Sequence, residues 1–182
     1  MTTYRSVVKR VSAALVAGAA MVLVAGCSGS VSIGGSDAIT KAGDAPVGSC
    51  VRIGTEPKDG KVEVFKASCD TSGDLTFIAA SVVPAGQECA DQNYSHITFD
   101  NDSEKLCVAS NFAADTCYQI PTAGSATLAD YRRIECSATP KTGTTAYRVV
   151  SRTEGTATCP AGQQAVNYAQ PKPLGFCLEA AA

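Results

Sequence analysis

The sequence has few of the residues on which most catalytic and metal sites depend. His96 is its only histidine, and therefore its only candidate for an unshifted acid or base near neutral pH. It contains no CxxC pair, no Gly-x-Ser-x-Gly turn and no Gly-x-Gly-x-x-Gly loop. These absences argue against a zinc site, a hydrolase nucleophile elbow and a dinucleotide-binding loop. We therefore predict a protein that is not an enzyme, with no catalytic residues, no cofactor and no bound metal.

Clustered basic residues are also scarce. Beyond residue 26 the chain has 12 Lys and Arg residues against 17 Asp and Glu residues, a net charge of −5. Arg132 and Arg133 are the one adjacent basic pair in that part, and we expect them on an exposed strand face. Nucleic acids require clustered positive charge, so the sequence excludes them as partners.

No acidic residue occurs before Asp37, whereas Arg5, Lys9 and Arg10 precede an apolar stretch over residues 11–26. A basic segment followed by an apolar one is typical of a secretory signal peptide. Its 16 residues are short for a membrane-spanning helix, which needs about 20. We predict that residues 1–26 are a cleaved signal peptide. The alternatives are cleavage at another position and an uncleaved anchor.

The apolar stretch ends in Leu-Val-Ala-Gly-Cys at residues 23–27, which resembles a bacterial lipobox. We predict lipidation of Cys27, which is also the odd residue among nine cysteines. A diacylglyceryl group with an N-acyl chain is enough for stable anchoring. The exported protein is then held by its lipid on the outer face of the bacterial cell membrane. Residues 27–43, rich in Gly, Ser and Ala, are expected to form a flexible linker.

The other eight cysteines fall into two groups of four with spacings of 19, 20 and 18 and then 19, 23 and 18 residues. This pattern predicts an internal duplication, with repeat unit 1 at residues 44–111 and repeat unit 2 at residues 112–182. The flanking sequences agree, since Phe77 corresponds to Tyr147 and the Leu106-Cys107 pair to Phe176-Cys177. At the same offset, His96 falls on Val166.

Each unit has about 65 residues, a size at which disulfides commonly supplement a small core. Four cysteines allow three pairings in each unit, and we consider two of them. In the rival pairing the first cysteine of a unit joins the fourth and the second joins the third. We favour bonds between successive cysteines, because each would bracket a strand, a turn and a strand: Cys50–Cys69, Cys89–Cys107, Cys117–Cys136 and Cys159–Cys177.

Short β-branched or alternating runs at residues 50–53, 61–65, 75–83, 97–99 and 147–150 predict strands, with turn-forming residues between them. The expected fold is mainly β, with two tandem, disulfide-stapled, mostly antiparallel domains after a signal peptide and a flexible tether. A short helix is an alternative over residues 89–93 and 161–168.

Several features outside the cysteines bear on function. The acidic run at residues 100–104 lacks the glycine of a calcium loop, so we interpret it as a solvated hairpin tip. His96 is expected on an exposed strand.

The two units differ in charge. Unit 1 has 11 acidic and 5 basic residues, and unit 2 has 5 acidic and 6 basic residues. Either the two units pack against each other, or the acidic unit presents a binding face outward. If there is a pocket, its candidate lining is His96 with the aromatic residues Tyr94, Phe99, Tyr147 and Tyr168.

The lipobox, the Gly48-Ser49-Cys50-Val51 opening, Cys69 and the Leu106-Cys107-Val108 ending resemble the LppU-type lipoproteins of actinobacteria. That family opens with Gly-Asp-Cys, and Ser49 replaces the aspartate here. The resemblance implies a surface lipoprotein without assigned catalytic residues. We predict a non-catalytic cell-envelope module that binds an envelope protein, a glycan or a small molecule. The alternatives are a hydrolase or thiol oxidoreductase without a recognisable motif, and a purely structural envelope protein.

Overall fold

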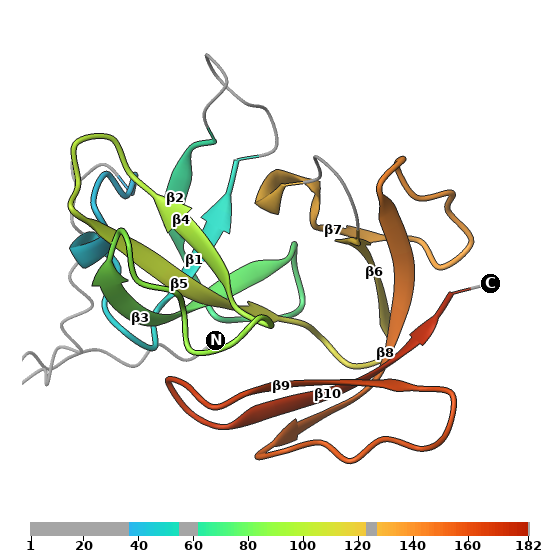
Figure 1. Ribbon diagram of the computed structural model, residues 1–182. Helices are drawn as coiled ribbons and strands as arrows, with labels where there is room; N and C mark the ends of the chain where they lie inside the picture. The colour runs from blue at the N-terminus through green and yellow to red at the C-terminus, as the bar shows by residue number, and fades with distance from the viewer. Residues whose placement is uncertain (1–36, 55–61, 123–126, 182) are drawn as a thin grey trace, which may run out of the picture. The chain divides into compact units, whose positions relative to one another are not determined.

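The described residues form two five-stranded antiparallel sheets, one in each unit. The structure, a computed structural model, describes residues 37–54, 62–122 and 127–181 (Figure 1). The first sheet has the order β2-β1-β3-β5-β4, and the second has the order β7-β6-β8-β10-β9. The strands of the first sheet are β1 (Cys50–Ile53), β2 (Val64–Ala67), β3 (Thr76–Pro84), β4 (Ser95–Thr98) and β5 (Glu104–Asn111). Those of the second are β6 (Thr116–Pro121), β7 (Arg132–Ile134), β8 (Thr144–Glu154), β9 (Gln164–Tyr168) and β10 (Leu174–Ala180).

The two sheets share one topology, and they also share an irregularity. The pairing of β3 with β5 skips Ala80, and the pairing of β8 with β10 skips Val150. In both sheets the skipped residue comes directly before the residue that pairs with the fourth cysteine of the unit, Cys107 or Cys177. A β-bulge at the same place in both units is a specific local feature. It supports the internal duplication independently of the cysteine spacing.

The chain enters the first strand of each unit through the same turn. Gly48 and Asp115 have positive φ angles of 89° and 55°. The N–H of Gly48 donates to the carbonyl of Ala79, and the N–H of Asp115 donates to the carbonyl of Val149, both at 2.8 Å. Glycine adopts this conformation freely, and aspartate is among the few other residues that tolerate it. The two openings therefore have the same geometry despite their different residues.

Four disulfides join successive cysteines, which confirms the pairing favoured from the sequence. Each unit has one bond from its first strand to the segment after its second strand and one from the loop before its fourth strand to its fifth strand. The bonds are Cys50–Cys69, Cys89–Cys107, Cys117–Cys136 and Cys159–Cys177. Such bonds persist in oxidising compartments, so they indicate an exported protein.

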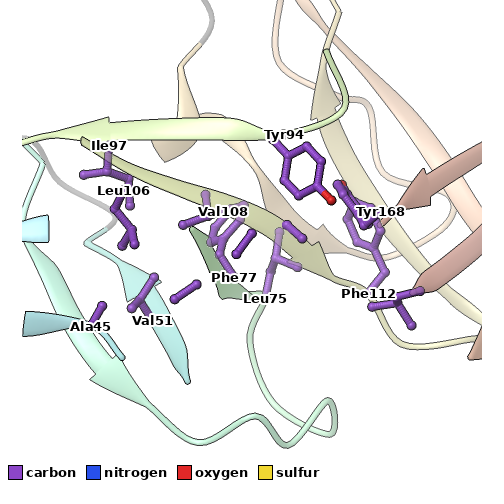
Figure 2. Close-up of a cluster of buried hydrophobic side chains, with 14 of the residues drawn as sticks. Ala45, Val51, Leu75, Phe77, Tyr94, Ile97, Leu106, Val108, Phe112 and Tyr168 are labelled. Carbon is purple, nitrogen blue, oxygen red and sulfur yellow. The ribbon is translucent and has the colours of Figure 1, made fainter. Parts of the chain in front are cut away.

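The buried side chains of both units form one continuous apolar cluster. Phe77 contacts Tyr131 across the units at a ring-centroid distance of 5.6 Å, and Tyr94 contacts Tyr168 at 5.2 Å. Phe112, in the connection between the sheets, lies among these buried aromatic residues (Figure 2). The two units thus pack together, which was one of the two arrangements considered from the sequence. Because this core and all four disulfides lie within residues 37–181, this part of the chain has what it needs to fold by itself.

The sequence predicts that the folded part begins at residue 44, but it begins earlier. The N–H of Ile39 donates to the carbonyl of Val64, and the N–H of Lys66 donates to the carbonyl of Asp37, both at 2.8 Å. Ile39 and Ala42 are buried. Residues 37–43 therefore cover the free edge of β2 and are not part of a flexible linker. The rest of that linker, Cys27 and the predicted signal peptide lie outside the described residues.

Two other expectations are corrected. Residues 164–168 form strand β9 and not a helix, because they pair with β10, and residues 89–93 form a turn. The helical elements of the described residues are two 3-10 turns, η1 (Ala42–Asp44) and η2 (Leu128–Asp130). The counterpart of His96 is Ala165 and not Val166, since His96 pairs with Cys107 and Ala165 with Cys177. The segment before β9 is one residue shorter than its counterpart before β4, which shifts the alignment.

Candidate functional site

A cavity of about 740 Å³ is lined by residues from both units, and we call it the junction cavity. Its volume lies within the range of about 300–1,000 Å³ that is usual for small-molecule sites. Unit 1 contributes Val47, Gly48, Cys69, Ile78 and Asn111. Unit 2 contributes Arg152, Glu154 and Gly155 from the end of β8, together with residues 171–174, which lead into β10.

Most of the wall of the junction cavity is apolar. Val47, Ile78, Pro171, Pro173 and Leu174 provide hydrocarbon surface. Val47 is 57% exposed and is the one large hydrophobic side chain with high exposure among the described residues. A single exposed valine is ordinary on a protein surface. Here, however, it lies at the rim of a cavity that offers further apolar contact.

Asn111 connects the two units at the base of this cavity. Its side chain is almost completely buried, and its Nδ2 donates to Thr76 Oγ1 at 2.9 Å and to the carbonyl of Cys69 at 3.1 Å. Its Oδ1 accepts a hydrogen bond from Arg152 Nη1 at 2.8 Å. A buried amide with satisfied donors and acceptor is held in one orientation. Asn111 therefore fixes Arg152 relative to the first disulfide of unit 1.

Arg152 is the principal charged group of the junction cavity. Besides Asn111, its Nη1 donates to the carbonyl of Phe112, and its guanidinium lies 5.6 Å from the ring centroid of Phe176. An arginine has five N–H donors, so three remain on Nε and Nη2, and no acceptor for them occurs among the described residues. Burial lowers the pKa of Arg152, opposed by the nearby Tyr118 and Glu154. The guanidinium is thus oriented on one side and available for binding on the other.

The charge of the junction cavity is opposite in sign to the net charge of the chain beyond residue 26. Arg152 and Lys172 contribute two positive charges, and Glu154 contributes one negative charge. The chain beyond residue 26 has a net charge of −5. A locally positive cavity in an acidic protein favours anionic ligands over cationic ones.

Unit 2 has a groove of about 500 Å³ at the corresponding place, beside its own first disulfide. Four of its lining positions match positions in the junction cavity: Asp115 replaces Gly48, Cys136 replaces Cys69, Arg148 replaces Ile78 and Ala181 replaces Asn111. We call it the unit 2 groove.

Charged side chains that pair with one another line the unit 2 groove. Arg148 Nη2 lies 3.3 Å from Asp115 Oδ1, and Arg148 Nη1 lies 3.8 Å from Glu179 Oε1. The positions of these three residues in unit 1 are occupied by Gly48, Ile78 and Ala109. These positions are therefore small or apolar in unit 1, whereas in unit 2 they carry charges that form ion pairs.

The candidate site residues from the sequence lie elsewhere. His96 and Tyr94 line a smaller pocket of about 300 Å³ with Glu88 and Asp91, and His96 is exposed on β4 as expected. The Tyr94 hydroxyl accepts a hydrogen bond from the N–H of Gln170 at 2.7 Å, which ties the two units together.

Tyr168 is part of the same contact between the units. Burial raises the pKa of its hydroxyl to about 12, against hydrogen bonding with Ser110. Phe99 and Tyr147 are half-buried against the core. Tyr94 and Tyr168 thus stabilise the packing of the units, and none of the four aromatic candidates lines the junction cavity.

The acidic run lies in the loop between β4 and β5, at the hairpin tip where it was expected. Asp102 is half-buried, however, and its Oδ2 accepts a hydrogen bond from the N–H of Ala42 at 2.9 Å. This carboxylate therefore attaches the N-terminal segment to the sheet. Among the described residues, no group of three or more His, Cys, Asp or Glu side chains could hold a metal ion.

Of the residues that line the junction cavity, only Gly48 and Cys69 stand out in the sequence, and both do so as parts of the cysteine motifs. Asn111 carries a weak signal, since it is the second of two polar residues that follow the apolar run at residues 106–109. Arg152, Lys172 and Glu154 are ordinary charged residues of an exposed strand and loop. No local pattern distinguishes them from others.

Comparison of the chain with family models, curated proteins and solved structures finds no match. The resemblance to LppU-type lipoproteins therefore stays a prediction. No helix in the described part of the chain has the length and hydrophobicity to cross a membrane.

Proposed function

We propose that this protein is a non-catalytic ligand-binding module of the cell envelope, attached to the membrane by a lipid on Cys27. Its binding site is the junction cavity. The observation that carries this proposal is the combination, in one cavity of about 740 Å³, of an apolar wall with a few oriented polar groups. That combination is typical of small-molecule sites.

The polar groups favour binding over catalysis. Two of them, Asn111 and Arg152, are engaged with each other by a hydrogen bond. An amide that supports a guanidinium orients an anion or a polar group of a ligand. It does not resemble a nucleophile beside a general base.

Binding can be tested with N-phenyl-1-naphthylamine, an uncharged probe that fluoresces in apolar sites. We expect residues 28–182, with all four disulfides formed, to bind one probe molecule saturably. The variant Ile78→Arg introduces the residue of the unit 2 groove at the equivalent position, and it should weaken binding at least tenfold. Arg148→Gln in the unit 2 groove is the matched control and should leave binding unchanged. Equal binding by all three proteins, or none by the first, would contradict the assignment.

The lipid anchor needs a separate test on the full chain expressed in a bacterium that processes lipoproteins. We expect mass spectrometry to find a mature N-terminus at Cys27 that carries acyl chains, and Cys27→Ser to abolish this modification. An N-terminal methionine on a mature, unacylated chain would refute the anchor without affecting the binding site.

A further inference from the structure

We infer that the ligand of the junction cavity is a small amphipathic carboxylate, with its acidic group at Arg152 and Lys172 and its apolar body against Val47 and Ile78. This inference rests on the proposed function and specifies the ligand class for that site. Its basis is the difference between two grooves that descend from one duplicated structure.

In the unit 2 groove, the charged side chains pair with one another. Arg148 lines this groove and forms ion pairs with Asp115 and Glu179 from the same unit. The junction cavity lacks an equivalent set of mutually satisfied charges. At the three corresponding positions, unit 1 has two small residues, Gly48 and Ala109, and the apolar Ile78. These substitutions remove the internal charges and leave room for an apolar group.

The positive charge of the junction cavity comes from unit 2 and is only partly balanced. Asn111 Oδ1 and the Phe112 carbonyl hold one nitrogen of Arg152, and the other N–H donors have no acceptor in the described part of the chain. A carboxylate accepts two parallel hydrogen bonds from a guanidinium. Lys172, which is exposed at the same cavity, adds a second positive charge. Glu154 opposes both and keeps the net charge of the cavity at +1.

The apolar lining requires more than a bare anion. Pro171 and Pro173 lie on either side of Lys172 in the sequence and Leu174 follows, so hydrocarbon surface flanks the positive charge. Each methylene group that a ligand buries there should strengthen binding about threefold to fourfold. A ligand with both an anionic end and an apolar body satisfies both parts of the lining.

Isothermal titration calorimetry on residues 28–182 can separate these contributions with four water-soluble probes. Octanoate has both features, 1-octanol has only the apolar body, acetate has only the anion, and octylammonium reverses the charge. We expect octanoate to bind with one-to-one stoichiometry and at least tenfold more tightly than each of the other three.

Variants of the charged lining should then change the affinity for octanoate in opposite directions. Lys172→Gln should weaken it about threefold, and Glu154→Gln should strengthen it by a similar factor, because both side chains are exposed. Neither residue has a side-chain hydrogen bond within the described residues, so both variants should fold normally. Arg152→Gln should weaken binding at least tenfold, and Arg148→Gln in the unit 2 groove should have no effect.

The outcomes distinguish this inference from the proposed function. Equal binding of octanoate and 1-octanol, or unchanged affinity in both the Lys172 and Glu154 variants, would overturn the carboxylate and leave the junction cavity as an apolar binding site. Tighter binding of octylammonium would also overturn it. If none of the probes binds and N-phenyl-1-naphthylamine does not bind either, both proposals fail.

Discussion

Asn111 offers a direct test of how the two units are joined. Replacing it with alanine removes two side-chain donors and the acceptor for Arg152, and leaves the Cys69 carbonyl and Thr76 without their partner. A buried polar group that loses its partner costs about 1–3 kcal/mol. Water from the adjacent junction cavity can replace part of these bonds. We therefore expect Asn111→Ala to lower the free energy of unfolding by about 2–3 kcal/mol.

A loss of this size is easily measured. For a protein of this length it corresponds to a decrease in Tm of roughly 5–10 °C. Urea denaturation followed by circular dichroism should give a lower midpoint with an unchanged slope. Asn93→Ala is the matched control, because Asn93 is exposed and makes a single hydrogen bond across the units. Its cost should stay within about 0.5 kcal/mol. Equal effects of the two substitutions would refute the role assigned to the buried amide.

Three other predictions concern packing and pH. A Cβ on Gly175 would lie 2.4 Å from a backbone nitrogen, so Gly175→Ala should destabilise the fold by several kcal/mol in thermal unfolding, whereas Gly73→Ala, with open space around it, should not. Because burial raises the pKa of Tyr168 from 10.0 to about 12, its contribution to stability is complete below pH 10 and disappears as the pH rises to 12. The free energy of unfolding of Tyr168→Phe should fall less steeply with pH between pH 10 and about 12 than that of the wild type. A titration followed by tyrosinate absorbance should show one fewer ionisation at the upper end of that interval. Hydrogen bonding by Lys141 lowers the pKa of Asp130, so the stability that this pair contributes is present above the unfolded pKa of about 3.8 and lost in stronger acid. Lys141→Gln should therefore be less stable than the wild type at neutral pH, and the difference should vanish at low pH in denaturant titrations.

Much of the architecture could be predicted from the cysteines and the strand patterns. The run at residues 50–53 coincides with β1, and the run at residues 75–83 overlaps β3 almost completely. These strands are rich in β-branched and apolar residues, so their local sequence agrees with their environment. The first and third spacings, 19 and 18 residues, are the same in the two groups of cysteines because these cysteines hold equivalent positions in the two sheets.

Other elements depend on tertiary pairing and could not be predicted locally. Residues 164–168 contain good helix formers, but their pairing with β10 makes them an edge strand. Residues 37–43 look like a linker because they are rich in small residues. Two backbone hydrogen bonds to β2 and the burial of Ile39 and Ala42 give them a fixed conformation. In both cases long-range contacts override a weak local preference.

The junction cavity was beyond prediction for a geometric reason. Its lining runs from Val47 to Leu174, and it exists only because β8 and the segment before β10 approach the first disulfide of the other unit. The sequence indicates that the units are related, but it does not indicate how they pack. The aromatic residues selected as candidates were chosen for their chemistry, and that chemistry suits the core equally well.

The duplication separates what the fold requires from what the site requires. Both units keep the strand order, the two disulfides and the positive φ angle before the first strand. Both also keep the bulge on the strand that pairs with the fourth cysteine. A feature present in both units is explained by the shared fold and does not single out the junction cavity. The differences fall on the groove, where Ile78 in one unit corresponds to the ion-paired Arg148 in the other. The same comparison explains why unit 2 supplies the charge. The charged residues of the unit 2 groove pair with one another, whereas Arg152 lies at the junction cavity, to which unit 1 contributes no carboxylate. A ligand carboxylate would complete in the junction cavity the kind of pairing that unit 2 makes internally.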